Sequence, residues 1–134
     1  MHKQIKTQWV KALTGGKYKQ GKLRLRTDEG GYCCLGVLCD MYAKSPEGKK
    51  KGAYWDESNL FHTSKRTDGE RTDLPSIVEK WAGGGIRSAK LKLGRVRLRG
   101  RYSSVSDYPV TLMGLNDDTK VGFRGIARRI KAEL

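Results

Sequence analysis

The chain is organised around residues 30–41, which read Gly30-Gly31-Tyr32-Cys33-Cys34-Leu35-Gly36-Val37-Leu38-Cys39-Asp40-Met41. A glycine pair followed by an apolar run predicts a tight turn that leads into a buried helix, here over residues 32–43. Gly36 is costly in the middle of a helix, so we expect a neighbouring segment to pack closely against it. Asp40 interrupts the apolar run, and we expect it to be exposed near the helix end because a buried carboxylate needs partners.

The stretch holds all three cysteines of the chain, Cys33, Cys34 and Cys39. Adjacent cysteines on a helix point in different directions, so a disulfide framework is not expected and the thiols should be buried and reduced. The spacing contains no CxxC pair, and the only histidines are His2 and His62. The sequence therefore predicts no metal site, no nucleophilic cysteine and no cofactor.

Length and composition predict one small domain over residues 1–134. Hydrophobic residues make up 37% of the chain, which allows a core, while seventeen glycines and 31% charged residues indicate many turns around it. Neither a membrane-length apolar run nor a signal-peptide core is present. We therefore expect a cytoplasmic protein without a membrane partner.

The net charge is +14, from 28 Lys and Arg against 14 Asp and Glu. The excess is concentrated: residues 1–27 hold eight basic residues and residues 86–101 hold seven, and neither segment contains an acid. Basic surfaces of this size attract polyanions and release counterions on binding. The alternative is a solvated, salt-screened surface with no partner.

Helical periodicity predicts further helices around the central one. They are expected at residues 4–14, from a start at Asp73–Pro75 to the glycines at 83–85, at residues 110–115 and at residues 121–134. Asp73 has the chemistry of a helix cap. The sequence between them, residues 44–72, reads as irregular loop with one short strand near residues 53–55.

Two segments alternate basic and apolar residues with the period of a half-buried strand. Residues 22–26 predict a strand with Leu23 and Leu25 facing inward. Within the basic segment 86–101, residues 89–99 predict a hairpin that turns at Gly94-Arg95, with a single strand bulged at Gly94 as the alternative. The outward side chains form the predicted phosphate-binding set: Lys22, Arg24, Arg26, Lys90, Lys92, Arg97 and Arg99.

The acidic residues offer little catalytic chemistry. Acids in a turn such as residues 116–119 are typically capping groups, and no phosphate-loop, nucleotide-fold or esterase signature is present. Enzymatic activity is therefore not the leading expectation. A small metal-dependent hydrolase that uses turn acids such as Asp117 stays open as an alternative.

The cysteine motif, Tyr32 to Asp40, resembles a family of short tailed-phage and prophage proteins. The resemblance extends to residues 9–13 and 16–21, to Leu74-Pro75 with Trp81, to residues 115–117, and to Phe123 with Ile126-Ala127. That family is uncharacterised, so the resemblance implies a phage setting and the host cytoplasm, but no activity. The basic residues 86–101 and Arg128-Arg129 depart from its pattern.

These observations predict an α+β domain, with four or five helices around a central buried helix and a short antiparallel sheet or hairpin. The leading functional expectation is a non-enzymatic phage accessory protein that binds DNA or RNA through phosphate contacts. An anti-defence protein that binds and inhibits a host enzyme or nuclease, or sequesters a nucleotide signal, is the alternative. The oligomeric state does not follow from the sequence.

Overall fold

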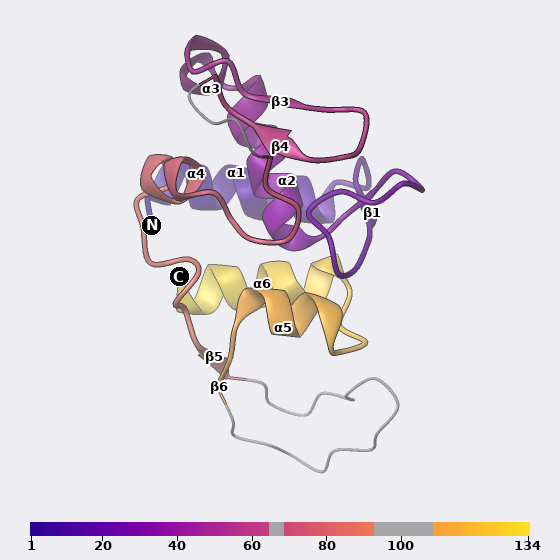
Figure 1. Ribbon diagram of the computed structural model, residues 1–134. Helices are drawn as coiled ribbons and strands as arrows, with labels where there is room; N and C mark the ends of the chain where they lie inside the picture. The colour runs from indigo at the N-terminus through magenta and orange to yellow at the C-terminus, as the bar shows by residue number, and fades with distance from the viewer. Residues whose placement is uncertain (65–68, 93–108) are drawn as a thin grey trace.

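The computed structural model describes residues 1–64, 69–92 and 109–134, and in them the α+β prediction is confirmed (Figure 1). The described helices are α1 (Lys3–Thr14), α2 (Cys34–Lys44), α3 (Pro46–Lys50), α4 (Ser76–Trp81), α5 (Leu112–Asp117) and α6 (Phe123–Glu133). The described strands are β1 (Lys19–Gln20), β2 (Gly31–Tyr32), β3 (Tyr54–Trp55), β4 (Phe61–His62), β5 (Leu91–Lys92) and β6 (Pro109–Val110). These strands form three separate pairs of two, β1–β2 parallel and the other two antiparallel.

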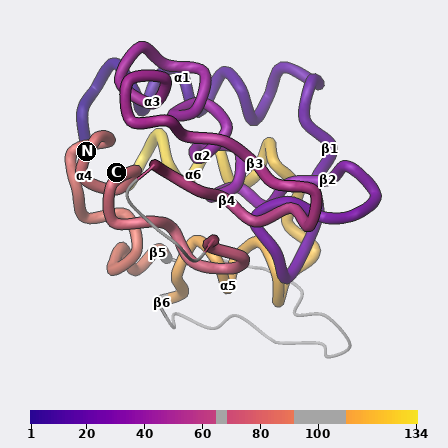
Figure 2. The backbone as a smooth tube through the Cα atoms, turned by 45° about the horizontal axis from the view of Figure 1, so that its top comes forward, coloured from indigo at the N-terminus to yellow at the C-terminus, as the bar shows by residue number. Residues whose placement is uncertain are grey.

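The central helix α2 is buried as predicted. Eight of its eleven residues are buried, and α1, α3, α4 and α5 all contact it. Figure 1 shows α2 between a layer of α5 and α6 on one side and α3 with the β3–β4 pair on the other. The turned view of Figure 2 keeps it at the centre, and in both views the two chain ends lie close together beside α4.

The N-terminal helix anchors this arrangement through Trp9. Its indole is fully buried, and its Nε1 donates a hydrogen bond of 3.0 Å to the carbonyl oxygen of Cys34 at the start of α2. Leu13 is buried on the same face. The prediction of helix 4–14 with Trp9 as a core anchor is confirmed, as is the final helix predicted at residues 121–134.

The close approach expected at Gly36 is confirmed. Residues 21–26 cross α2 at this glycine, where an added Cβ would overlap the carbonyl oxygen of Leu25 and lie 2.6 Å from its carbonyl carbon. Leu25 itself is fully buried, its amide donates to the Arg71 carbonyl oxygen at 2.8 Å, and its carbonyl accepts from the Cys33 amide at 3.2 Å.

The strand predicted over residues 22–26 is wrong. The segment is a loop with one isolated bridge, between Arg26 and Tyr32, and its Leu23 is 63% exposed with a left-handed φ of 68°. A left-handed residue breaks the alternation of an extended strand. The backbone amide of Leu23 instead donates to the Asp117 carboxylate at 3.1 Å, so contacts with α5 determine the path of the loop.

Two smaller expectations need correction. Residues 44–72 are not one irregular loop with a single strand, because Ser45 caps α3 by accepting a 3.0 Å bond from the Gly48 amide, and the strand expected near residues 53–55 is present as β3 and pairs with β4. The helix predicted from Asp73 begins later, with Pro75 at its cap position, and Asp73 makes no cap. Five described helices surround α2, as expected.

The predicted hairpin at residues 89–99 is described only at its beginning. Its first residues form β5, which pairs with β6 and aligns Leu91 with Val110. The turn at Gly94-Arg95, the pairing of the remaining residues and the alternative bulge at Gly94 lie outside the described residues.

Candidate polyanion-binding surface

The five described residues of the predicted phosphate-binding set come from two separate segments. Lys22, Arg24 and Arg26 belong to the loop that bonds the end of α5, whereas Lys90 and Lys92 lie at β5, which pairs with the strand leading into the start of α5. Lys90 is exposed. Arg97 and Arg99 lie outside the described residues.

The three basic side chains of the loop have partners within the protein. The ammonium of Lys22 donates to the carbonyl oxygens of Asn116 at 2.5 Å and Thr119 at 2.8 Å, where the end of a helix carries partial negative charge. Arg24 makes a 3.8 Å ion pair with Asp28. The Arg26 guanidinium lies 5.8 Å from the Tyr32 ring centroid and 5.6 Å from that of Trp55. Lys22 in particular joins the loop to the end of α5.

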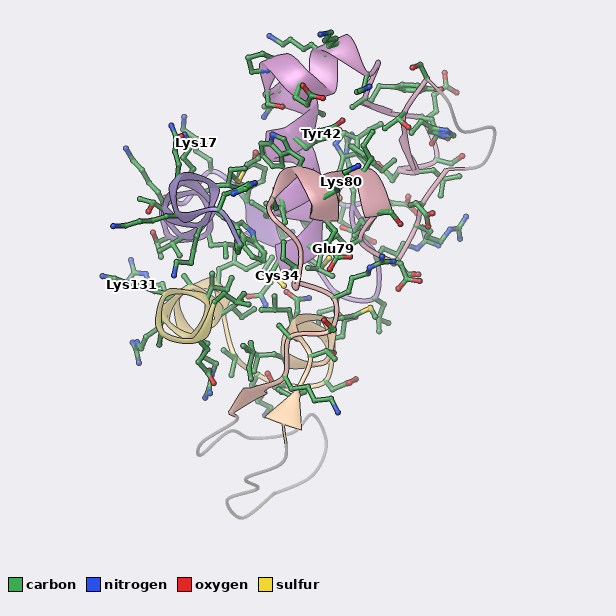
Figure 3. All side chains as sticks on the ribbon, turned by 90° about the vertical axis from the view of Figure 1, so that its left-hand side faces the viewer. Lys17, Cys34, Tyr42, Glu79, Lys80 and Lys131 are labelled. Carbon is green, nitrogen blue, oxygen red and sulfur yellow. The ribbon has the colours of Figure 1, made fainter. Side chains whose placement is uncertain are left out.

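A second basic surface is formed by the two terminal helices, α1 and α6, and by Lys17 just after α1. The two helices make the most extensive helix–helix contact among the described elements. Each helix buries an apolar stripe and turns its basic residues outward, and α1 contains no acid. Figure 3 shows the two helices nearly end on and side by side, with Lys17 and Lys131 on the same outer side. We call the following exposed residues the α1–α6 basic face: Lys3, Lys11, Lys17, Arg124, Arg128 and Lys131.

This face differs electrostatically from the loop 21–26. None of its six cations makes an ion pair with a carboxylate in the described part of the chain. Long, exposed, unpaired Lys and Arg side chains on adjacent helices can each reach a phosphate oxygen without breaking an internal contact. Sequence periodicity placed most of these residues on outer helix faces, but the pairing of the two chain ends was not predictable from it.

The buried carboxylate of Asp40 joins three parts of the chain. It is 6% exposed, which makes the expectation of surface exposure wrong. It accepts hydrogen bonds from the Tyr18 hydroxyl at 2.5 Å and the Trp55 indole at 3.1 Å, and it pairs with the Lys44 ammonium at 2.7 Å. These partners compensate for burial of the charge. Burial, together with the Asp40 bond, raises the pKa of Tyr18 to about 12.

Two further acids, Asp56 and Asp117, also have structural roles. Asp56 accepts bonds from the amides of Ser58 and Leu60, and its second oxygen lies 2.6 Å from His62 Nε2. Asp117 accepts from the Leu23 amide and the Asn116 side chain. No group of three or more His, Cys, Asp or Glu side chains is placed to hold a metal ion within residues 1–64, 69–92 and 109–134.

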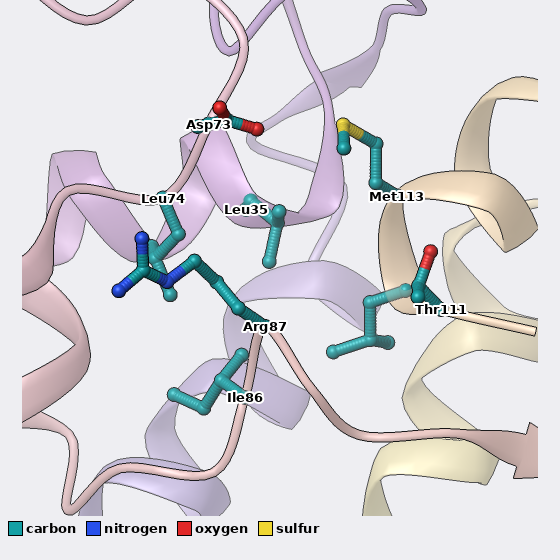
Figure 4. A pocket seen from close by; sticks show the side chains of 8 residues that line it. Leu35, Asp73, Leu74, Ile86, Arg87, Thr111 and Met113 are labelled. Carbon is teal, nitrogen blue, oxygen red and sulfur yellow. The ribbon is translucent and has the colours of Figure 1, made fainter.

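A small apolar pocket of about 140 Å³ lies between the start of α2, the segment after α4, and α5 (Figure 4). Figure 4 shows the Arg87 side chain between Leu74 and Ile86. The Arg87 guanidinium forms an ion pair with Glu79, with Nε lying 2.6 Å from Oε2. The other lining residues are mainly hydrophobic, so the pocket offers no obvious charged group for a polyanion.

The three cysteines are free and buried, as predicted. Cys33 caps α2, its sulfur accepting from the Gly36 amide at 3.3 Å. Burial raises the pKa of Cys33 to about 11 and holds the pKa values of Cys34 and Cys39 well above the usual thiol range. These thiols have the environment of core residues rather than of nucleophiles.

We therefore expect the thiols of the native protein to react with iodoacetamide at pH 8 at least about 100-fold more slowly than those of the urea-unfolded chain. The thiolate is the reacting species, and both the raised pKa values and burial suppress it. Mass spectrometry of quenched time points measures the labelling. A thiol that labels equally fast in both states would contradict the buried α2 described above.

No described helix is both long enough and apolar enough to cross a membrane. The sequence model of one protein family, described as a domain of unknown function (DUF8296), matches residues 1–134. No curated protein and no solved structure matches the chain.

Proposed function

This chain belongs to the DUF8296 family, and we propose that it binds the phosphate backbone of DNA or RNA, without catalysis, through the α1–α6 basic face. Following the resemblance of its cysteine motif, we further propose that it does so as a phage accessory protein in the host cytoplasm.

The observation that carries the proposal is the set of six exposed cations, five on two adjacent helices and Lys17 just after the first of them. They come from both ends of the chain, and α1 has no acid to offset them. The net charge of +14 adds a long-range attraction for polyanions. Phosphate contacts from flexible Lys and Arg side chains position a nucleic acid but carry no sequence information, so we expect binding with little base preference.

Reversing three charges of this face tests the proposal. We expect the variant Lys11→Glu, Arg128→Glu, Lys131→Glu to bind a 20-base-pair duplex at least about 100-fold more weakly than the unmodified protein at low salt. The slope of log affinity against log salt should fall by about 3, because each lost phosphate contact removes roughly 0.9 from it. Fluorescence anisotropy titrations between 50 and 300 mM salt measure both quantities, for duplex DNA, single-stranded DNA and RNA.

The matched control is Lys49→Glu, Lys50→Glu, Arg71→Glu, which makes the same change in net charge at three exposed positions outside this face. We expect it to lower affinity through the long-range attraction alone and to keep the salt slope. Equal effects of the two triple variants would contradict a localised site. The absence of salt-dependent binding to all three nucleic acids would overturn the proposed function.

A further inference from the structure

A second candidate site lies at a cavity of about 570 Å³ that shares no residue with the α1–α6 basic face. It is bounded by the N-terminal segment, the end of α2, α3 and α4. Its walls are formed by His2, Tyr42, Glu47, Lys51, Ile77, Lys80 and Trp81. Two of these side chains, Tyr42 and Lys80, are labelled in Figure 3. The volume falls within the range of cavities that bind small ligands.

The hydroxyl of Tyr42 is the feature that points to a ligand. Tyr42 is fully buried, and its hydroxyl has no hydrogen-bond partner among the described residues. Its ring is held on edge against Trp81, with centroids 5.3 Å apart. By contrast, the indoles of Trp9 and Trp55 and the hydroxyl of Tyr18 all have hydrogen-bond partners. A buried hydroxyl without a partner is destabilising, so it is usually retained for a reason.

Tyr42 and Glu47 both line the cavity. Burial raises the pKa of Tyr42, and the negative charge of Glu47 adds to the effect, so the hydroxyl keeps its proton at neutral pH and can donate a hydrogen bond. The hydroxyl is itself covered in the free protein, so a ligand reaches it when a wall side chain moves aside.

The charges of the walls favour an anionic group. Lys51 follows α3 and Lys80 lies in the last turn of α4, and neither ammonium has an ion-pair partner in the described part of the chain. A cation near the end of a helix is stabilising in itself, which explains each lysine separately. It does not explain why two lysines from different segments, a buried hydroxyl and an apolar wall of Ile77 and Trp81 line one cavity.

We propose that this cavity binds a nucleoside phosphate. The phosphate lies between Lys51 and Lys80, the Tyr42 hydroxyl donates a hydrogen bond to the ligand, and the base packs against Ile77 and Trp81. Lysine is a common phosphate ligand, and an indole beside an aliphatic side chain suits a planar base. Glu47 supplies an acceptor for a ribose hydroxyl or an exocyclic amino group.

Titration calorimetry with the full chain tests this inference, with AMP, GMP, CMP, UMP, adenosine and inorganic phosphate as probes. We expect at least one nucleoside monophosphate to bind saturably, with a dissociation constant below about 1 mM. Adenosine and inorganic phosphate should each bind at least about tenfold more weakly than the corresponding monophosphate. Failure of all four monophosphates to bind at millimolar concentration would overturn the inference. Binding of inorganic phosphate as tight as that of AMP would overturn the assignment to a nucleoside.

Two variants locate the binding. Lys51→Gln with Lys80→Gln should weaken it at least about tenfold, whereas the control Lys49→Gln with Lys50→Gln, at exposed positions in α3, should not. Tyr42→Phe removes only the hydroxyl, so we expect weaker binding of the ligand but an unchanged or higher melting temperature of the free protein. A lower melting temperature in Tyr42→Phe, or equal binding in the two lysine pairs, would contradict the site.

The inference stands apart from the proposed function, and one variant separates them. The triple reversal of Lys11, Arg128 and Lys131 should lose nucleic-acid affinity and keep its affinity for the monophosphate. Parallel loss of both would show that the monophosphate binds at the α1–α6 basic face, and would overturn the cavity assignment.

Discussion

Replacing Gly36 with alanine is expected to lower the free energy of unfolding by about 4 kcal/mol or more, a large share of the roughly 5–15 kcal/mol by which such domains are stable. The added methyl group would overlap the carbonyl oxygen of Leu25 and lie 2.6 Å from its carbonyl carbon. Backbone cannot move aside as a flexible side chain does, so either residues 21–26 must leave α2 or the helix must shift. Each movement would uncover the fully buried side chain of Leu25.

Chemical denaturation followed by circular dichroism measures this loss. Gly122→Ala is the matched control, because an added Cβ there has no neighbour closer than 3.7 Å and its φ of −77° suits any residue. We expect the control to change the free energy of unfolding by no more than about 1 kcal/mol. A Gly36→Ala protein as stable as this control would mean that the loop does not cross α2 as described.

Local patterns predicted the helices well, because an apolar stripe indicates a helix whichever element packs against that stripe in the fold. The spacing of Ile5, Trp9 and Leu13 was enough for α1, and the stripe from Phe123 to Ile130 was enough for α6. The close contact at Gly36 was also predictable, because glycine in a buried helix is costly without such a contact.

Contacts between distant segments account for what the sequence did not predict. The alternation of residues 22–26 fits a strand. Hydrogen bonds from this segment to Asn116, Asp117 and Thr119 hold it in a loop conformation instead. The burial of Asp40 was not predictable, because its donors Tyr18 and Trp55 lie 22 and 15 residues away in the sequence. The α1–α6 basic face also depends on contacts between distant segments. The sequence pattern of each helix predicted its outward lysines and arginines, but the tertiary fold brings the two helices together.

The Asn116→Ala substitution is expected to cost about 3 kcal/mol of unfolding free energy, because this amide joins the N-terminal loop to the C-terminal helices. The side chain is fully buried. Its Oδ1 accepts from the Gln20 side chain at 3.1 Å and the Cys34 amide at 3.3 Å, and its Nδ2 donates to the Gly21 carbonyl at 2.9 Å. Truncation would leave the Cys34 amide and the Gly21 carbonyl without this partner.

Asn116→Asp sharpens the test by keeping the shape and the Oδ1 acceptor while replacing the donor with a second oxygen. That oxygen would face the Gly21 carbonyl and the Asp117 carboxylate, which now accepts from Nδ2 at 2.8 Å. We therefore expect the aspartate variant to be at least as unstable as the alanine variant at pH 7, while Asp118→Ala, at an exposed neighbour, changes stability by no more than about 0.5 kcal/mol. If Asn116→Ala cost no more than Asp118→Ala, the two ammonium bonds of Lys22 to the end of α5 would have to hold the loop without the amide. Lys22 would then be the residue that attaches the loop to the end of α5.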